Sequence, residues 1–143
     1  MAEKYKFSVT AEFESSLPEV WDALVNPKKI KQYLFGTDTV TDWKIGSPII
    51  FQGVWDGVPY QDKGTILEFI PEKILKYDYW SSFSKLEDVP ENYQQLTFEL
   101  TVNGAKVLLT LTQDNIPNEP ARDHSAENWK MVLDQIKKIV ENN

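Results

Sequence analysis

The sequence contains no cysteine and a single histidine, His124. These absences exclude a disulfide scaffold, a thiol nucleophile and a zinc site built from cysteine and histidine. Nowhere do about eighteen apolar residues follow one another, as a membrane-spanning helix requires, and the first residues lack the apolar segment of a signal peptide. We therefore expect a cytoplasmic protein that is not inserted in a membrane and needs no cofactor.

Basic residues are also few. Lys and Arg number 15 against 22 Asp and Glu, which gives a net charge of −7. Binding to nucleic acid or to an anionic membrane needs a basic surface, and the short basic clusters are only Lys28-Lys29-x-Lys31 and Lys137-Lys138. We therefore expect no nucleic-acid partner.

Four aspartates, Asp38, Asp42, Asp56 and Asp62, are candidates for a metal site. They fall in different predicted turns and lack the spacing of a calcium-binding loop. Aspartate is common in turns because its side chain bonds to the nearby backbone. We therefore expect solvated turn residues rather than metal ligands.

The sequence does contain enough apolar residues for one sizeable core. It has 143 residues, of which 41% are hydrophobic. A chain of this length buries roughly 70% of its unfolded surface when it folds. Because no repeat or flexible linker divides it, residues 1–143 are expected to form one domain.

An alternation of apolar and polar residues predicts most of the strands. From Tyr5 to Phe13 every second residue is apolar, which is typical of a half-buried strand. Similar segments follow at residues 49–55, 60–70, 75–79, 96–102 and 107–111. Asp56-Gly57 predicts a hairpin, and Asn103-Gly104 predicts a second one with a type I′ turn, in which both central residues have positive φ.

Helical spacing occurs near both ends of the chain. Ser16-Leu17-Pro18-Glu19 reads as a capping box, which starts a short helix that Asn26-Pro27 ends. A second short helix is expected at residues 28–33. From Trp129 to Val140 apolar residues recur every three or four positions, which predicts a long amphipathic helix. Its start is open between Pro120 and Ser125.

The order of these elements predicts an α+β fold. One strand, two short helices, about six more strands and the terminal helix follow one another, and hairpin turns make the sheet antiparallel. The terminal helix is the one predicted element long and apolar enough to cover the apolar face of the sheet. We expect it to lie across that face.

This order resembles the START-like helix-grip (SRPBCC) superfamily. The segments that carry the resemblance are Ser16 to Leu24, Asn26-Pro27, Thr41-Asp42-Trp43-x-x-Gly46, Leu86 to Tyr93, Leu111 to Asn115 and His124 to Leu133. The branch of Hsp90-ATPase-activator homologues is the most similar, in particular its small stand-alone bacterial members. The resemblance implies a seven-stranded antiparallel sheet around the terminal helix, with a cavity that in many relatives holds a small apolar or aromatic molecule.

The candidate ligand-binding residues are apolar side chains on the inferred inner faces of the strands and the helix. They are Phe51, Trp55, Ile66, Tyr79, Phe98, Trp129 and Leu133. A cavity wall and plain core packing both fit this pattern.

Two polar residues are ambiguous. His124 is either a polar group at the cavity mouth or an exposed side chain near the start of the helix. Glu68 has the parity of inward-facing Ile66, yet a bulge in the strand would turn it to solvent.

Three functions follow as hypotheses. The first is non-catalytic binding of a small apolar or aromatic molecule, and the second is a protein-interaction role on an Hsp90-type chaperone, which the resemblance suggests. The second is weakened because we expect one domain with no companion segment. The third is a cyclase- or hydratase-like enzyme with Tyr79 or His124 as acid or base, which ranks last because no coupled catalytic pair is visible.

Overall fold

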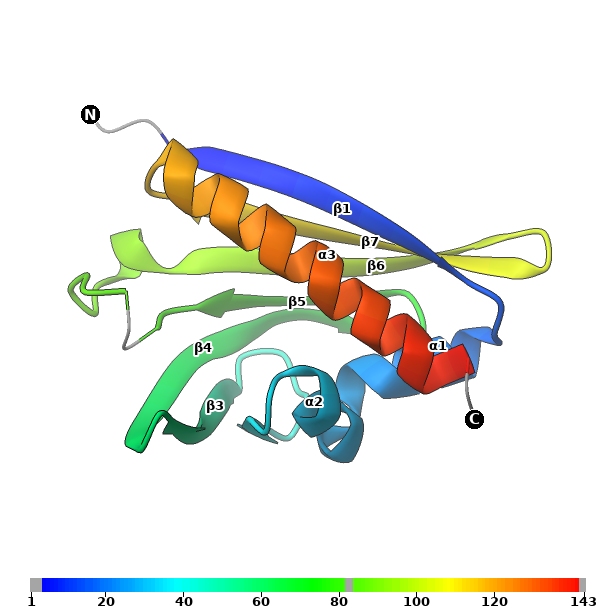
Figure 1. Ribbon diagram of the computed structural model, residues 1–143, viewed down its shortest axis with the longest axis horizontal. Coiled ribbons are helices and arrows are strands. Elements are labelled where there is room, and N and C mark those ends of the chain that lie inside the picture. Colours follow the sequence, from blue (N-terminus) through cyan, green and yellow to red (C-terminus); the bar gives the residue numbers. More distant parts are fainter. Residues whose placement is uncertain (1–3, 82–83, 142–143) are drawn as a thin grey trace.

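The computed structural model describes residues 4–81 and 84–141. Its elements are β1 (Tyr5–Phe13), α1 (Leu17–Val25), α2 (Pro27–Tyr33), β2 (Asp38–Val40), β3 (Pro48–Trp55), β4 (Val58–Ile70), β5 (Ile74–Tyr79), the 3-10 helix η1 (Pro90–Asn92), β6 (Gln94–Asn103), β7 (Lys106–Ile116) and α3 (Glu119–Glu141). Within these residues the strands form one seven-stranded antiparallel sheet in the order β1-β7-β6-β5-β4-β3-β2. The helix α3 crosses one face of this sheet, and α1 and α2 lie near its C-terminal end (Figure 1). The predicted α+β helix-grip architecture is confirmed.

Side-chain caps separate the two short helices. The Ser16 hydroxyl accepts a hydrogen bond from the Glu19 backbone N–H at 3.4 Å, which starts α1. Asn26 then serves both helices, because its backbone N–H bonds to the Asp22 carbonyl at 2.8 Å and its side chain accepts from the Lys28 N–H at 3.1 Å. These bonds satisfy backbone groups that a helix end leaves without a partner.

A bulge in β4 decides the orientation of Glu68. The register of β4 against β5 shifts between Ile66 and Glu68. Ile66 is fully buried, whereas Glu68 is exposed and Phe69 packs against the core. The strand parity alone would have buried the Glu68 carboxylate, so the extra residue of the bulge avoids the cost of an unpaired buried charge.

The core lies under the C-terminal half of α3. The buried residues of this helix are Val132, Leu133, Ile136 and Val140. They belong to the same apolar cluster as the inner faces of the strands. The helix begins at Glu119, and none of its first ten residues has a buried side chain. None of the described helices is long and apolar enough to cross a membrane.

The two predicted hairpins are present, but their turns differ. Asp56 and Gly57 have φ of 51° and 77°, as a type I′ turn requires. In the β6–β7 hairpin Asn103 pairs with Lys106, so the central residues are Gly104 and Ala105, and positive φ occurs only at Gly104. The predicted type I′ turn with Asn103 in a central position is therefore wrong, and the geometry is that of type II′.

Replacing Gly104 with valine is expected to destabilise the protein by about 1 kcal/mol or more, because a β-branched residue resists a φ of 66°. Valine at Ala105, which has no positive φ, is the matched control and should change stability by less than about 0.5 kcal/mol. Urea denaturation of both variants measures the difference. Equal midpoints for the two variants would contradict the type II′ assignment.

Candidate ligand pocket

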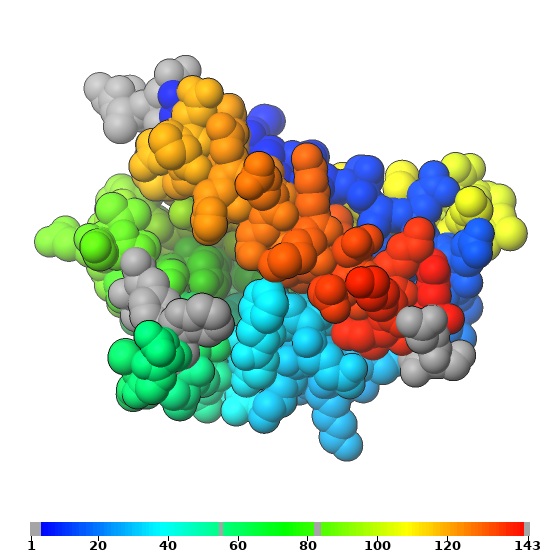
Figure 2. Space-filling model, viewed as in Figure 1, coloured from blue at the N-terminus to red at the C-terminus, as the bar shows by residue number. Residues whose placement is uncertain are grey.

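A pocket of about 700 Å³ lies between the N-terminal half of α3, the inner face of the sheet and the loop after α2. Figure 2 shows the surface hollowed between the orange part of α3 and the cyan segment after α2, with green strands at the bottom of the hollow. Small-molecule sites in proteins commonly enclose about 300–1,000 Å³. The volume is therefore sufficient for a small organic ligand.

Aromatic rings form the floor of the pocket. They touch one another in a continuous series from β5 to α3, through the ring pairs Tyr79–Phe51 (6.0 Å between centroids), Phe51–Tyr77 (5.6 Å), Tyr77–Phe98 (5.9 Å) and Phe98–Trp129 (5.8 Å). Ring contacts at these separations are favourable beyond the area that they bury. The floor is thus a rigid apolar surface that offers ring faces and edges to a ligand.

A small void lies beneath this floor. It has about 20 Å³ and is lined in part by Leu75, Phe98 and Trp129. A volume near that of a single water probe holds no organic molecule. A ligand would therefore rest on the aromatic floor and not below it.

One wall carries a buried carboxylate. Asp62 on β4 is only 6% exposed, and its Oδ2 accepts a hydrogen bond of 2.7 Å from the Tyr79 hydroxyl on β5. Burial raises the pKa of the Tyr79 hydroxyl well above its ordinary value, and the charge of Asp62 adds to this shift. Tyr79 therefore stays protonated and donates to Asp62.

The same wall continues through Tyr60 and Thr37, whose hydroxyls are hydrogen-bonded to each other. Tyr60 pairs across the strands with Gly53, and a Cβ atom at Gly53 would lie 2.8 Å from the Tyr60 hydroxyl oxygen. The absence of a side chain at Gly53 therefore gives the Tyr60 ring room to lie over β3 and reach Thr37.

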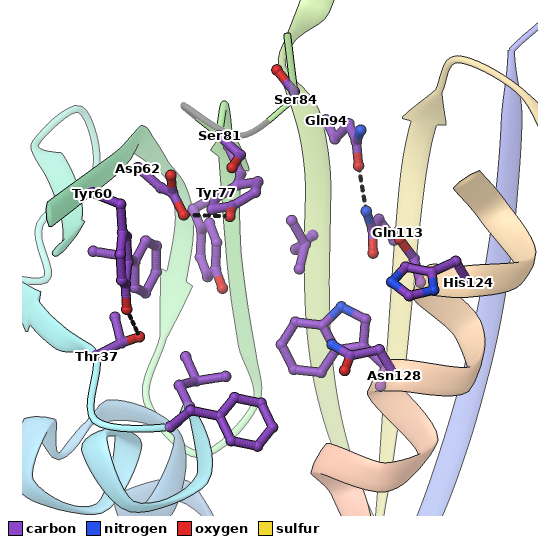
Figure 3. Close-up of a pocket in the computed structure, with 17 residues that line it drawn as sticks. Thr37, Tyr60, Asp62, Tyr77, Ser81, Ser84, Gln94, Gln113, His124 and Asn128 are labelled. Atoms are coloured by element: carbon purple, nitrogen blue, oxygen red, sulfur yellow. Dashed lines mark hydrogen bonds between the residues drawn. The ribbon is translucent and has the colours of Figure 1, made fainter. Parts of the chain in front are cut away.

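The opposite wall carries amide groups. Gln113 on β7 donates a hydrogen bond from its Nε2 to Oε1 of Gln94 on β6. Gln113 is only 5% exposed, and its own Oε1 is buried without a hydrogen-bond partner in the described structure. His124 and Asn128 of α3 lie on this side, facing Asp62 and Tyr60 across the pocket (Figure 3).

Tyr77 places a further polar group among the rings. Its side chain lines the pocket and is 6% exposed, and burial raises the pKa of its hydroxyl. No hydrogen bond to this hydroxyl occurs among residues 4–81 and 84–141. Tyr77 can therefore donate to or accept from a molecule in the pocket.

The sequence-predicted site residues divide into three groups. Phe51, Tyr79 and Trp129 line the pocket, and Phe98 lies beneath it as part of the floor. Ile66 and Leu133 line neither space, because both are packed in the core. The side chain of Trp55 lies outside the described part of the structure.

The expectation for Asp62 is also corrected. The sequence pattern predicts a solvated turn residue, but Asp62 lies inside β4 and lines the pocket. The signal for this position was in the sequence, since Asp62 has the same strand parity as buried Ile66. His124 is exposed and also lines the pocket. The two alternatives given for it, an exposed side chain and a polar group at the cavity mouth, therefore both apply.

Comparison with known proteins identifies the family. The family model described as "Activator of Hsp90 ATPase homolog 1-like protein" matches residues 14–141. No curated protein matches the sequence.

Solved structures agree with the family match. The solution structure of ChR145 from Cytophaga hutchinsonii is 42% identical, with a TM-score of 0.86 over 99% of this chain and 97% of that one. CalU16 from Micromonospora echinospora is 20% identical, with a TM-score of 0.76 over 96% of this chain and 77% of that one, and it shows the same fold. Protein MLL2253 from Mesorhizobium loti, at 16% identity and a TM-score of 0.77 over 97% and 98% of the two chains, also shares the fold. The chain therefore belongs to the family of Activator of Hsp90 ATPase homolog 1-like proteins.

Proposed function

We propose that this protein binds a small, largely apolar molecule with an aromatic or similarly compact body, and that it does so without changing the ligand chemically. The observation that carries the proposal is the 700 Å³ pocket over a floor of mutually contacting rings. An apolar cavity with a few polar groups is the usual form of a small-molecule site. The family and the fold are compatible with a ligand-binding or interaction module.

The chemistry of the polar groups supports binding over catalysis. Tyr79 holds its proton at neutral pH and donates it in a hydrogen bond to Asp62. An acid that retains its proton so strongly is a poor general acid near neutrality. A cyclase- or hydratase-like role for Tyr79 is therefore the weaker proposal.

A role on an Hsp90-type chaperone is the alternative, and the family description favours it. This role would require a surface that contacts the chaperone and would not require an open pocket. Stimulation of a chaperone ATPase that persists when the pocket is filled would support this alternative over ligand binding.

The pocket can be tested with the neutral fluorescent probe N-phenylnaphthylamine. Isothermal titration should give saturable binding with a Kd of about 1 μM, or about −8 kcal/mol. The probe should also quench tryptophan fluorescence, because Trp129 lines the pocket.

A pair of variants on α3 supplies the control. Ser125 lines the pocket, whereas Glu127 is exposed and does not line it. Ser125→Phe should fill part of the pocket and weaken probe binding by about tenfold or more, and Glu127→Phe should bind like the wild type. Binding that is absent in the wild type, or unchanged in Ser125→Phe, would refute the proposed function.

A further inference from the structure

The pocket lining holds a buried carboxylate. Among the described residues that line it there is no lysine or arginine, and His124 is the one basic side chain, while Asp62 contributes a carboxylate that is only 6% exposed. A charge with little access to water acts strongly on its neighbours, because water screens it poorly. The pocket therefore repels anions and attracts cations.

The aromatic floor adds to this preference. The Phe51 ring contacts the rings of both Tyr77 and Tyr79. Tyr79 donates a hydrogen bond to Asp62, so the carboxylate lies at the edge of this series of rings. The face of an aromatic ring carries negative charge density and attracts an ammonium group. A cation beside Asp62 would gain from both the carboxylate and the rings.

From these two features we infer that the pocket selects organic cations, namely protonated amines carried on an aromatic or aliphatic body. This inference rests on the proposed function, since it names the chemical class of ligand for the same pocket. The apolar body lies on the rings of Phe51, Tyr77 and Trp129, and the ammonium group lies toward Asp62. Carboxylates and phosphates bind more weakly, because Asp62 repels them and the described lining offers them no lysine or arginine.

Three compounds with one ring system and different charges test the inference. They are naphthylmethylamine, naphthylmethanol and naphthoic acid, titrated calorimetrically at neutral pH. The amine should bind the wild-type protein about tenfold more tightly than the alcohol, and the acid should bind most weakly. An amine that binds no more tightly than the alcohol overturns the inference.

Asp62→Asn locates the source of the preference. The ratio of amine affinity to alcohol affinity should fall from about ten toward one in this variant. Asp134→Asn, which removes an exposed carboxylate of α3 outside the pocket, changes the net charge equally and should keep the ratio. A ratio that is unchanged in Asp62→Asn, or equally reduced in Asp134→Asn, would show that general charge and not the pocket carboxylate attracts the amine.

The two proposals fail in distinguishable ways. If N-phenylnaphthylamine binds and Ser125→Phe prevents this, the proposed function stands even when the three naphthyl compounds bind equally. That outcome overturns only the preference for amines. If neither the neutral probe nor any naphthyl compound binds, both proposals fail. Circular dichroism would reveal whether Asp62→Asn folds. If it does not, the affinities of the amine, the alcohol and the acid for the wild-type protein still decide whether the pocket prefers amines.

Discussion

Replacing Leu133 with alanine is expected to lower the free energy of unfolding by about 2–5 kcal/mol. Leu133 is 3% exposed and belongs to the core cluster that joins α3 to the sheet. Truncation removes buried methyl groups and leaves a cavity, because the neighbouring strands cannot close on the helix without moving the whole sheet. Chemical denaturation monitored by circular dichroism measures the loss.

Met131 on the same helix supplies the control. It is 48% exposed, so Met131→Ala should change the unfolding free energy by less than about 0.5 kcal/mol. Indistinguishable midpoints for Leu133→Ala and wild type would mean that α3 is not packed on the sheet as described.

Strongly alkaline solution is expected to unfold the protein, because three buried tyrosines resist ionisation. Burial raises the pKa values of Tyr33, Tyr77 and Tyr79 above the ordinary value of 10.0. Above pH 10 the unfolded chain therefore releases protons that the folded protein keeps. Stability is fully present below that pH and falls as pH rises toward the folded-state pKa values, by about 1.4 kcal/mol per pH unit for each tyrosine, or about 4 for all three.

Tyr77→Phe isolates one of these contributions. The variant keeps the ring contacts, and the Tyr77 hydroxyl has no hydrogen bond within the described residues, so little change is expected at neutral pH. Above pH 10 its stability should fall less steeply than that of the wild type, by about 1.4 kcal/mol per pH unit. Urea denaturation at a series of alkaline pH values gives both slopes. Parallel slopes would contradict the burial of Tyr77.

The fold could be predicted from the sequence because its strands and helices carry different periods. The alternation from Tyr5 to Phe13 matches β1, and the spacing from Trp129 to Val140 matches the buried stripe of α3. The turn type at Gly104 could not be predicted, because a shift of one residue in the pairing moves Asn103 out of the turn centre.

The pocket was harder to predict than the fold. Strand parity indicates which face a side chain takes, and it placed Phe51 and Tyr79 correctly on the inner face. It does not indicate whether that part of the face is covered by packed side chains or by open space. Ile66 and Leu133 therefore looked like pocket residues although both side chains are packed in the core.

The polar groups of the pocket were missed for a different reason. Asp62 and Gln113 share the parity of buried apolar neighbours, Ile66 and Leu111, but polar residues are ordinarily assigned to the surface. Their burial becomes intelligible once Tyr79 and Gln94 supply hydrogen bonds from adjacent strands. These cross-strand partners depend on register, which composition and parity do not fix.

The central claim, that this pocket is a ligand site, is tested most directly by a two-dimensional NMR titration of the nitrogen-15-labelled protein with the neutral probe N-phenylnaphthylamine. We expect saturable shifts of the Trp129 indole N–H and of the side-chain amides of Gln94, Gln113 and Asn128, all of which line the pocket. Backbone signals of distant residues, such as those of the Gly104 turn, should not move. An unchanged spectrum at saturating ligand, or shifts confined to residues outside the pocket, would contradict the account.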